Sequence, residues 1–266
     1  MLLAIDTSTR QLGVAYYANE RILGEINWVA GFHATEQLME SITQLWAMIA
    51  NSGQAPESAI PPESSPTATT MDGLHALAQS QVPISAVAVV GGPGSFSGLR
   101  VGMATAKGFC LTLGVPLVTV PTLDAIAFPH LQSSNAHVCA LLQAGRGEYY
   151  VGWYRSVARN WRRLEDYAIL GIEDVCTRIV KRTVICGEIS EEHRKLVEDS
   201  VEKKLVVFPS GLSSVRRAGT VAVLGAENLA KGWTVDPLTA EPDYLRRPAA
   251  EVPRHRINPT IGGLSP

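Results

Sequence analysis

The chain predicts the same order of secondary structure twice, and this repeat limits the possible folds more than any other feature. Each half reads as three strands, a helix, a strand, a helix and a strand. Hydrophobic periodicity predicts the first half as strands 2–6, 12–18 and 21–28, a helix over 34–50, a strand over 84–90, a helix that ends at Gly114 and a strand over 117–120. The second half follows as strands 136–142, 148–154 and 164–170, a helix over 172–180, a strand over 183–186, a helix over 190–200, a strand over 205–208 and a last helix over 215–231.

Two such units predict two lobes. A three-strand meander that leads into βαβ crossovers forms a mixed sheet with helices on its faces. We therefore expect an α/β fold with a first lobe over 1–120, a second lobe over 121–232, and an extended segment with a basic tail over 233–266. A Pro- and Ser-rich loop near 51–70 interrupts the first lobe.

The composition is that of a globular protein. Of the 266 residues, 46% are hydrophobic and 18% are charged, and the net charge is −2. These values exclude a disordered chain and a free-standing polycation. No apolar stretch reaches the roughly 18 residues that a membrane span needs, and the N-terminus lacks the basic region of a signal peptide. We expect a cytoplasmic protein without a membrane contact.

The cysteines and histidines predict no metal site. Cys110, Cys139, Cys176 and Cys186 have no CxxC spacing, so free thiols are expected. A metallopeptidase has little support, because the chain has no paired-histidine motif and no Ser or Cys with a recognisable base.

The duplicated order resembles the two-lobed actin, Hsp70 and sugar-kinase superfamily. In active members of that superfamily, the turn between the first two strands of each half grips the nucleotide phosphates and the metal. The first turn here keeps an acid and hydroxyls, whereas the second turn, residues 143–147, has no carboxylate. A single acid holds Mg²⁺ weakly. We therefore expect no cofactor in the isolated chain, and at most a vestigial phosphate site at Asp6, Thr7, Ser8, Gly94 and Ser95.

The glycine-rich segment 91–100 is neither a P-loop nor a dinucleotide fingerprint, because its spacing matches neither motif. Two interpretations stay open. Free backbone N–H groups at the start of the following helix attract an anion, or the small residues Gly98, Gly102, Ala106 and Cys110 let another helix approach closely. We favour the second, because the small-residue stripe continues for three turns.

The helix over 34–50 carries a bulky stripe that widens beyond one core-facing side. Met39, Trp46 and Met48 add to the residues already at core spacing. This helix and the glycine-rich helix, taken from two chains, would make a four-helix interface. The alternative is that all three bulky residues belong to the core.

Several segments together resemble the bacterial TsaB (YeaZ) family. They are residues 5–9, 33–38, 92–102, 106–108 and 244–246. The resemblance implies a noncatalytic scaffold in the machinery that adds threonylcarbamoyl to the adenosine next to the anticodon of tRNA. It also implies that the related subunit TsaD carries the metal and the transfer reaction, and that TsaE is a partner ATPase. ATP and metal are then expected on partner subunits.

The resemblance implies pairing with TsaD through the helices of the first lobe, and an isolated chain could pair with itself. The predicted interface residues are Leu38, Met39, Ile42, Trp46, Gly98, Arg100, Gly102, Met103, Ala106 and Lys107. The chain lacks the HxxxH metal pair of TsaD, which favours a scaffold over a transferase. The alternative function is a small kinase or ATPase that uses Asp6 on magnesium and the glycine-rich turn on phosphate.

The C-terminal tail is basic. Arg246, Arg247, Arg254 and Arg256 stand against Glu251 alone. Such a tail either contacts tRNA phosphates or serves as a solubilising end, and we favour the second interpretation.

Overall fold

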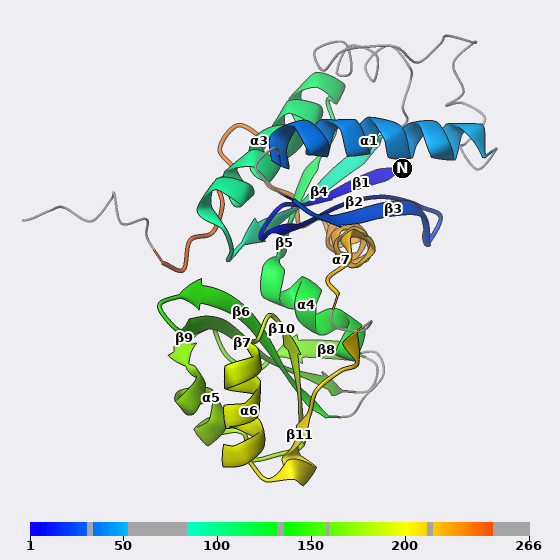
Figure 1. Ribbon diagram of the computed structural model, residues 1–266. Helices are drawn as coiled ribbons and strands as arrows, with labels where there is room; N and C mark the ends of the chain where they lie inside the picture. Colours follow the sequence, from blue (N-terminus) through cyan, green and yellow to red (C-terminus); the bar gives the residue numbers. More distant parts are fainter. Residues whose placement is uncertain (31–33, 53–83, 132–135, 158–159, 212–214, 247–266) are drawn as a thin grey trace, which may run out of the picture.

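Two mixed β-sheets lie one above the other, with two helices between them (Figure 1). The computed structural model describes the chain except residues 31–33, 53–83, 132–135, 158–159, 212–214 and 247–266. The Pro- and Ser-rich loop near 51–70 and most of the basic tail therefore lie outside the described residues. The predicted duplicated α/β fold is confirmed, because each sheet has the same strand order.

The first sheet has the order β3-β2-β1-β4-β5. Its central strand β1 pairs antiparallel with β2 and parallel with β4. Leucine, isoleucine, valine and alanine make up most of β1 and β4, and both strands are buried along their whole length, as is typical of strands covered by helices on each side. The strands are β1 (Leu2–Asp6), β2 (Gln11–Ala18), β3 (Arg21–Val29), β4 (Ala86–Gly92) and β5 (Leu117–Pro121).

Read from the corresponding edge, the second sheet repeats this plan in the order β8-β7-β6-β10-β11, and β9 also pairs with β7. Its central strand β6 pairs antiparallel with β7 and parallel with β10, as β1 does with β2 and β4. The strands are β6 (His137–Gly145), β7 (Glu148–Val157), β8 (Asn160–Arg163), β9 (Ala168–Gly171), β10 (Thr183–Gly187) and β11 (Val206–Val207). The chain thus has the fold of the actin, Hsp70 and sugar-kinase superfamily.

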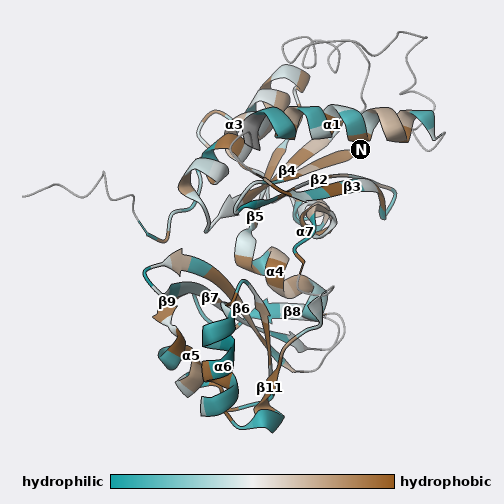
Figure 2. Cartoon of the chain, viewed as in Figure 1, coloured by the Kyte–Doolittle hydropathy of each residue, from teal (hydrophilic) through white to brown (hydrophobic). Residues whose placement is uncertain are grey.

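Helices cover both faces of each sheet. On the first sheet α1 (Ala34–Asn51) and α3 (Phe96–Leu113) lie on the outer face, and α7 (Ala218–Ala230) lies on the inner face (Figure 1). On the second sheet α4 (Thr122–Leu131) covers the inner face, while α5 (Ile172–Arg178) and α6 (Glu191–Ser200) pack on the outer face. Figure 2 shows hydrophilic residues along the outer helices α1 and α6.

Helix α4 is a helix that the sequence pattern did not predict. Its residues are buried on nearly all sides, because it packs on β6 and β7 and also contacts α7. A helix buried all round has no polar face, so it shows no amphipathic periodicity. The internal Pro129 further obscures the helical pattern.

Two other predictions need correction. The single strand expected over 164–170 is replaced by β8 and β9, which pair with different parts of β7. The last helix, α7, was assigned to the second lobe, but it packs against all five strands of the first sheet. The segment after α7 also returns to the first lobe, where Val235 N donates to Leu117 O at 2.9 Å.

The described part of the chain contains no helix that is long and apolar enough to cross a membrane. All four cysteines are free.

Candidate functional site

The turn after β1 places a carboxylate at the carboxyl end of the central strand. Asp6 is 3% exposed. Its Oδ1 accepts hydrogen bonds from Ser8 N at 3.0 Å and from Ser8 Oγ at 2.7 Å. Its Oδ2 accepts a hydrogen bond from Arg216 Nε, and the two side chains form an ion pair. Both carboxylate oxygens are therefore occupied by groups of the chain itself.

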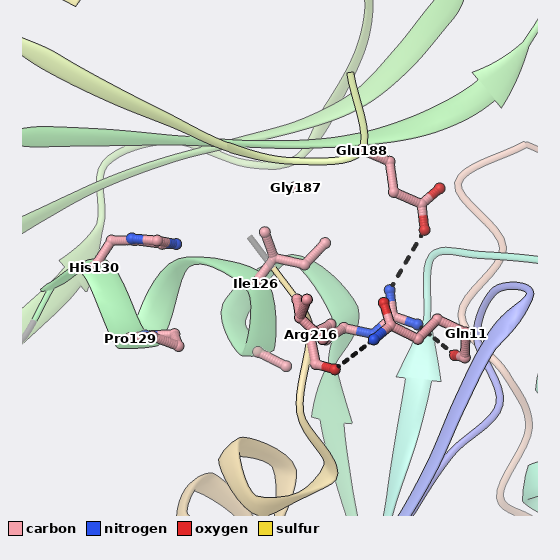
Figure 3. Close-up of a pocket in the computed structure, with 9 residues that line it drawn as sticks. Gln11, Ile126, Pro129, His130, Gly187, Glu188 and Arg216 are labelled. Carbon is pink, nitrogen blue, oxygen red and sulfur yellow. Dashed lines mark hydrogen bonds and ion pairs between the residues drawn. The ribbon is translucent and has the colours of Figure 1, made fainter. Parts of the chain in front are cut away.

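Arg216 fills the first turn. Its Nη2 donates to Thr9 Oγ1 at 2.8 Å and to Gln11 O at 2.9 Å. In return, Gln11 Nε2 donates to the carbonyl of Arg216 at 3.0 Å (Figure 3). Arg216 is only 7% exposed. A guanidinium thus stands beside the acid on which the kinase alternative would place magnesium.

The glycine-rich segment packs directly against this turn. A Cβ on Gly94, Gly98 or Gly102 would lie 2.3 Å from Ser8 O, 2.1 Å from Thr7 O or 2.2 Å from Thr7 Oγ1, respectively. Thr7 Oγ1 also donates to Gly98 O at 2.7 Å. The close approach predicted from the glycine spacing therefore comes from the β1–β2 turn of the same chain, and not from a second helix.

The N-terminus of α3 is already capped. Ser95 Oγ accepts from Gly98 N at 3.4 Å, and Ser95 N donates to Ser8 O at 2.6 Å. These contacts take up groups that the anion interpretation left free.

The second turn, between β6 and β7, is held in a similar way. Arg246 Nη1 donates to Ala144 O at 3.0 Å, and Arg246 Nη2 pairs with Glu148. The residue belongs to the C-terminal segment, which passes from the first lobe to this turn. Arg246 was predicted as a cation of the basic tail, but in the structure it is bound to the second sheet.

The N-terminus of α7 is also occupied. Ala218 N donates to Asn27 Oδ1 at 2.9 Å, and Gly219 N donates to Glu25 Oε2 at 2.9 Å. A Cβ on Gly219 would lie 2.7 Å from Glu25 Oε2, so the carboxylate rests directly on the helix end. The first turn, the second turn and this helix end are thus all filled by the chain's own side chains.

A pocket lies between the lobes beside Arg216 (Figure 3). Glu188, which directly follows β10, lies across it with Oε1 at 3.8 Å from Arg216 Nη1. His130 of α4 lines the same pocket, and burial lowers the pKa of its imidazole. Among the described residues, no group of three or more His, Cys, Asp or Glu side chains is arranged to hold a metal ion.

Comparison with known proteins decides the family. The family model of TsaD, described as tRNA N6-adenosine threonylcarbamoyltransferase, matches residues 51–253. The tRNA threonylcarbamoyladenosine biosynthesis protein TsaB of Haemophilus influenzae is 30% identical over 256 residues, which cover 92% of this chain and 93% of that protein. The chain belongs to the TsaB (YeaZ) family.

Two further TsaB-family members agree in extent. TsaB of Bacillus subtilis is 22% identical over 94% of this chain and 96% of its own length. The solved structure of YeaZ from Pseudomonas aeruginosa aligns with a TM-score of 0.65 and 23% identity, over 92% of this chain and 99% of that one. The match shows that this chain has the fold of YeaZ along nearly its whole length.

Six of the ten residues predicted at a TsaB-type partner interface lie in the chain's own core. A side chain with almost no exposed surface cannot contact a partner unless the core opens. The reason is that these residues form the core-facing sides of α1 and α3, where the sheet covers them. They are Leu38, Ile42, Trp46, Gly102, Met103 and Ala106.

The other four predicted residues are at least partly accessible. Met39 and Gly98 are half-buried. Arg100 is exposed, but it stacks on Phe96 at 3.9 Å from the ring centroid and donates to Tyr244 Oη at 3.2 Å. Lys107 Nζ donates to the carbonyls of the C-terminal segment at residues 238 and 240. These two cations hold the chain's own C-terminal segment.

The exposed apolar side chains of α1 and α3 are ones that the prediction did not select for the interface. Met48 of α1 is 61% exposed and Leu111 of α3 is 55% exposed. Met48 was weighed as part of the bulky stripe, whereas Leu111 was missed. With the half-buried Met39, they are apolar groups that the first-lobe helices offer to a partner. Phe96 of α3 is also 38% exposed, and its ring contacts Arg100 and Tyr244.

Sequence reasoning also missed Arg216 as a site residue. Its partner Asp6 is 210 positions away along the chain. The local signal was the pair Arg216-Arg217 directly before an apolar helix, where cations face the positive end of the helix dipole. Such a placement is unfavourable unless a carboxylate compensates it, and here Asp6 and Glu25 do so.

A second, partly buried acid connects α4 to the second sheet. Asp124 Oδ1 accepts hydrogen bonds from Tyr154 Oη at 2.8 Å and Tyr167 Oη at 2.6 Å. Burial raises the pKa of the Asp124 carboxyl, and the two hydroxyl donors offset part of that rise.

We expect Asp124→Asn to flatten the pH dependence of stability. Because the folded pKa of Asp124 is higher than the unfolded one, the folded chain holds this proton to higher pH. The resulting stabilisation is complete below the unfolded pKa and is lost as the pH rises above about 4 and through the folded value. The free energy of unfolding, measured in urea at a series of pH values, should therefore decline less over this range in the variant. Parallel curves for variant and wild type would contradict this account.

Proposed function

We propose that this chain is a noncatalytic subunit that binds and supports a TsaD transferase in tRNA threonylcarbamoyladenosine biosynthesis. Membership of the TsaB family supports the role in this tRNA modification. The observation that carries the noncatalytic part is the buried Asp6–Arg216 pair, which occupies the acid needed for a metal and phosphate. Metal, ATP and the transfer reaction then belong to partner subunits, with TsaE as the ATPase. The complex, rather than this chain alone, binds the tRNA.

The kinase or ATPase alternative makes a different prediction for the purified chain. Magnesium in such a site would need a free oxygen of Asp6, and both oxygens are already hydrogen-bonded. We therefore expect titration calorimetry with magnesium and ATP to show no saturable binding. Micromolar binding that Asp6→Ala abolishes would favour the alternative.

Docking of TsaD on the outer face of the first lobe is tested at Met48. Because this side chain is 61% exposed, Met48→Glu should leave the melting temperature of the isolated chain unchanged. A carboxylate buried in an apolar contact carries a desolvation cost. We expect TsaD from the same organism to bind the variant at least about tenfold more weakly, which is a loss of about 1.4 kcal/mol.

A matched control is Val180→Glu, which changes an exposed apolar residue of the second lobe that is 74% accessible. Its affinity for TsaD should equal that of the wild type. If Met48→Glu binds TsaD as tightly as Val180→Glu does, the docking face has been assigned wrongly. If the isolated chain pairs with itself through the same face, sedimentation should show that Met48→Glu also shifts it towards monomer.

A further inference from the structure

Arg216 contacts both lobes. On one side it binds Asp6, the last residue of β1 in the first sheet, and Thr9 in the turn that follows. On the other side its Nη1 faces Glu188, which follows β10 of the second sheet (Figure 3). The guanidinium thus bridges the two sheets through side chains that come from three separate segments.

The backbone directs Glu188 into this position. Gly187 has a positive φ of 99°, and a Cβ there would lie 2.1 Å from Leu141 O. The next residue, Glu188, donates its N–H to the same carbonyl at 2.9 Å. The end of β10 is therefore held tightly, and the Glu188 side chain extends towards Arg216.

Arg246 makes a second bridge through the C-terminal segment. This segment is anchored on the first lobe, where Asp243 N donates to Gly91 O at 2.7 Å and the Tyr244 ring lies 5.0 Å from that of Phe96. Two residues later, Arg246 binds the turn between β6 and β7 of the second sheet. A short extended chain with polar anchors at each end therefore joins the lobes.

We propose that Arg216 and Arg246 are internal clamps that fix the angle between the two lobes, in the place where the superfamily's active members hold nucleotide phosphates. Relative motion of two domains is the ordinary expectation, and ligand-driven closure is a common form of it. Here each of the two hairpin turns is held by a guanidinium of the same chain. The two lobes thus keep one relative arrangement without a ligand. This expectation does not depend on whether TsaD is the partner of the chain.

The clamps can be tested by measuring the distance between the lobes in the full chain. Spin labels are placed on exposed cysteines introduced by Arg21→Cys in β3 and Asp199→Cys in α6, with Cys176→Ser to remove the partly accessible native thiol. Labelled chains are diluted with unlabelled protein, so that pulsed electron–electron double resonance measures only distances within one chain.

The variant Asp6→Asn with Arg216→Met removes the first clamp without leaving a buried charge unpaired. Arg246→Met removes the second clamp, whose partners are half-exposed, so this variant keeps the fold even if the first does not. The control is Arg217→Met, because the partner of Arg217 among the described residues is Glu25, which belongs to the first lobe.

We expect a single narrow distance distribution for the wild type and for Arg217→Met. Each clamp variant should broaden the distribution and shift its mean, and their combination should do so most. An unchanged distribution in folded Arg246→Met and in the folded double variant would overturn the proposal. Equal broadening in Arg217→Met would overturn it as well, because loss of any arginine would then have the same effect.

Discussion

Arg216→Met should lower the free energy of unfolding by about 3–5 kcal/mol, the usual cost of removing one partner of a buried ion pair. The side chains of Arg216 and Asp6 are each 4% exposed, so the substitution leaves a buried carboxylate without its counter-ion. The hydrogen-bond acceptors Thr9 Oγ1 and Gln11 O also lose their donor. Denaturation in urea, monitored by circular dichroism, measures the loss.

Two comparisons make this prediction specific. Asp6→Asn combined with Arg216→Met should recover much of the loss, because neither buried charge then remains unpaired. Arg217→Met, at the next position, should cost no more than about 1 kcal/mol, since the Arg217 side chain is exposed and its pair with Glu25 is partly solvated. If Arg216→Met and Arg217→Met lower the free energy of unfolding equally, burial of the Asp6–Arg216 pair does not increase its contribution to stability.

Gly98→Ala should destabilise the chain by about 1–3 kcal/mol, because overpacking forces the backbone to shift. The new Cβ would lie 2.1 Å from Thr7 O, which belongs to the backbone of the turn that carries Asp6. Neither atom is at the end of a flexible side chain, so relief requires the turn and the start of α3 to separate.

Gly108→Ala is the matched control on the same helix. Apart from its chain neighbours and the backbone of its own helix, no atom of the described residues lies within 4 Å of a Cβ at Gly108, so the substitution adds helix propensity without a clash. It should stabilise the chain by about 0.5–1 kcal/mol. Thermal unfolding of both variants tests the pair. If the two substitutions change stability in the same direction, the glycine-rich block has a role other than contact with the turn.

Most strands of the two sheets could be predicted because their signals are local, whereas β8 and β9 were predicted as one strand. Apolar alternation and β-branched runs identified the strands, and the order of those strands led to the duplicated fold. The helix that ends at Gly114 was predicted from a terminal glycine, and Gly114 does adopt a positive φ of 66°. Helix α4 was not predicted because burial on nearly every side removes the polar face by which a helix is usually recognised.

Only part of the candidate site could be predicted from the sequence in this way. The sequence by itself determined that the turn after β1 holds an acid and hydroxyls, that its counterpart lacks an acid, and that the glycine spacing requires a close neighbour. Only the tertiary structure decided that this neighbour is the turn itself, that Arg216 neutralises Asp6 from 210 positions away, and which sides of α1 and α3 are buried. The physical reason is that the periodicity of apolar residues along the chain indicates which positions are buried. Which residues cover a buried group depends on contacts between distant segments, and these form only on folding.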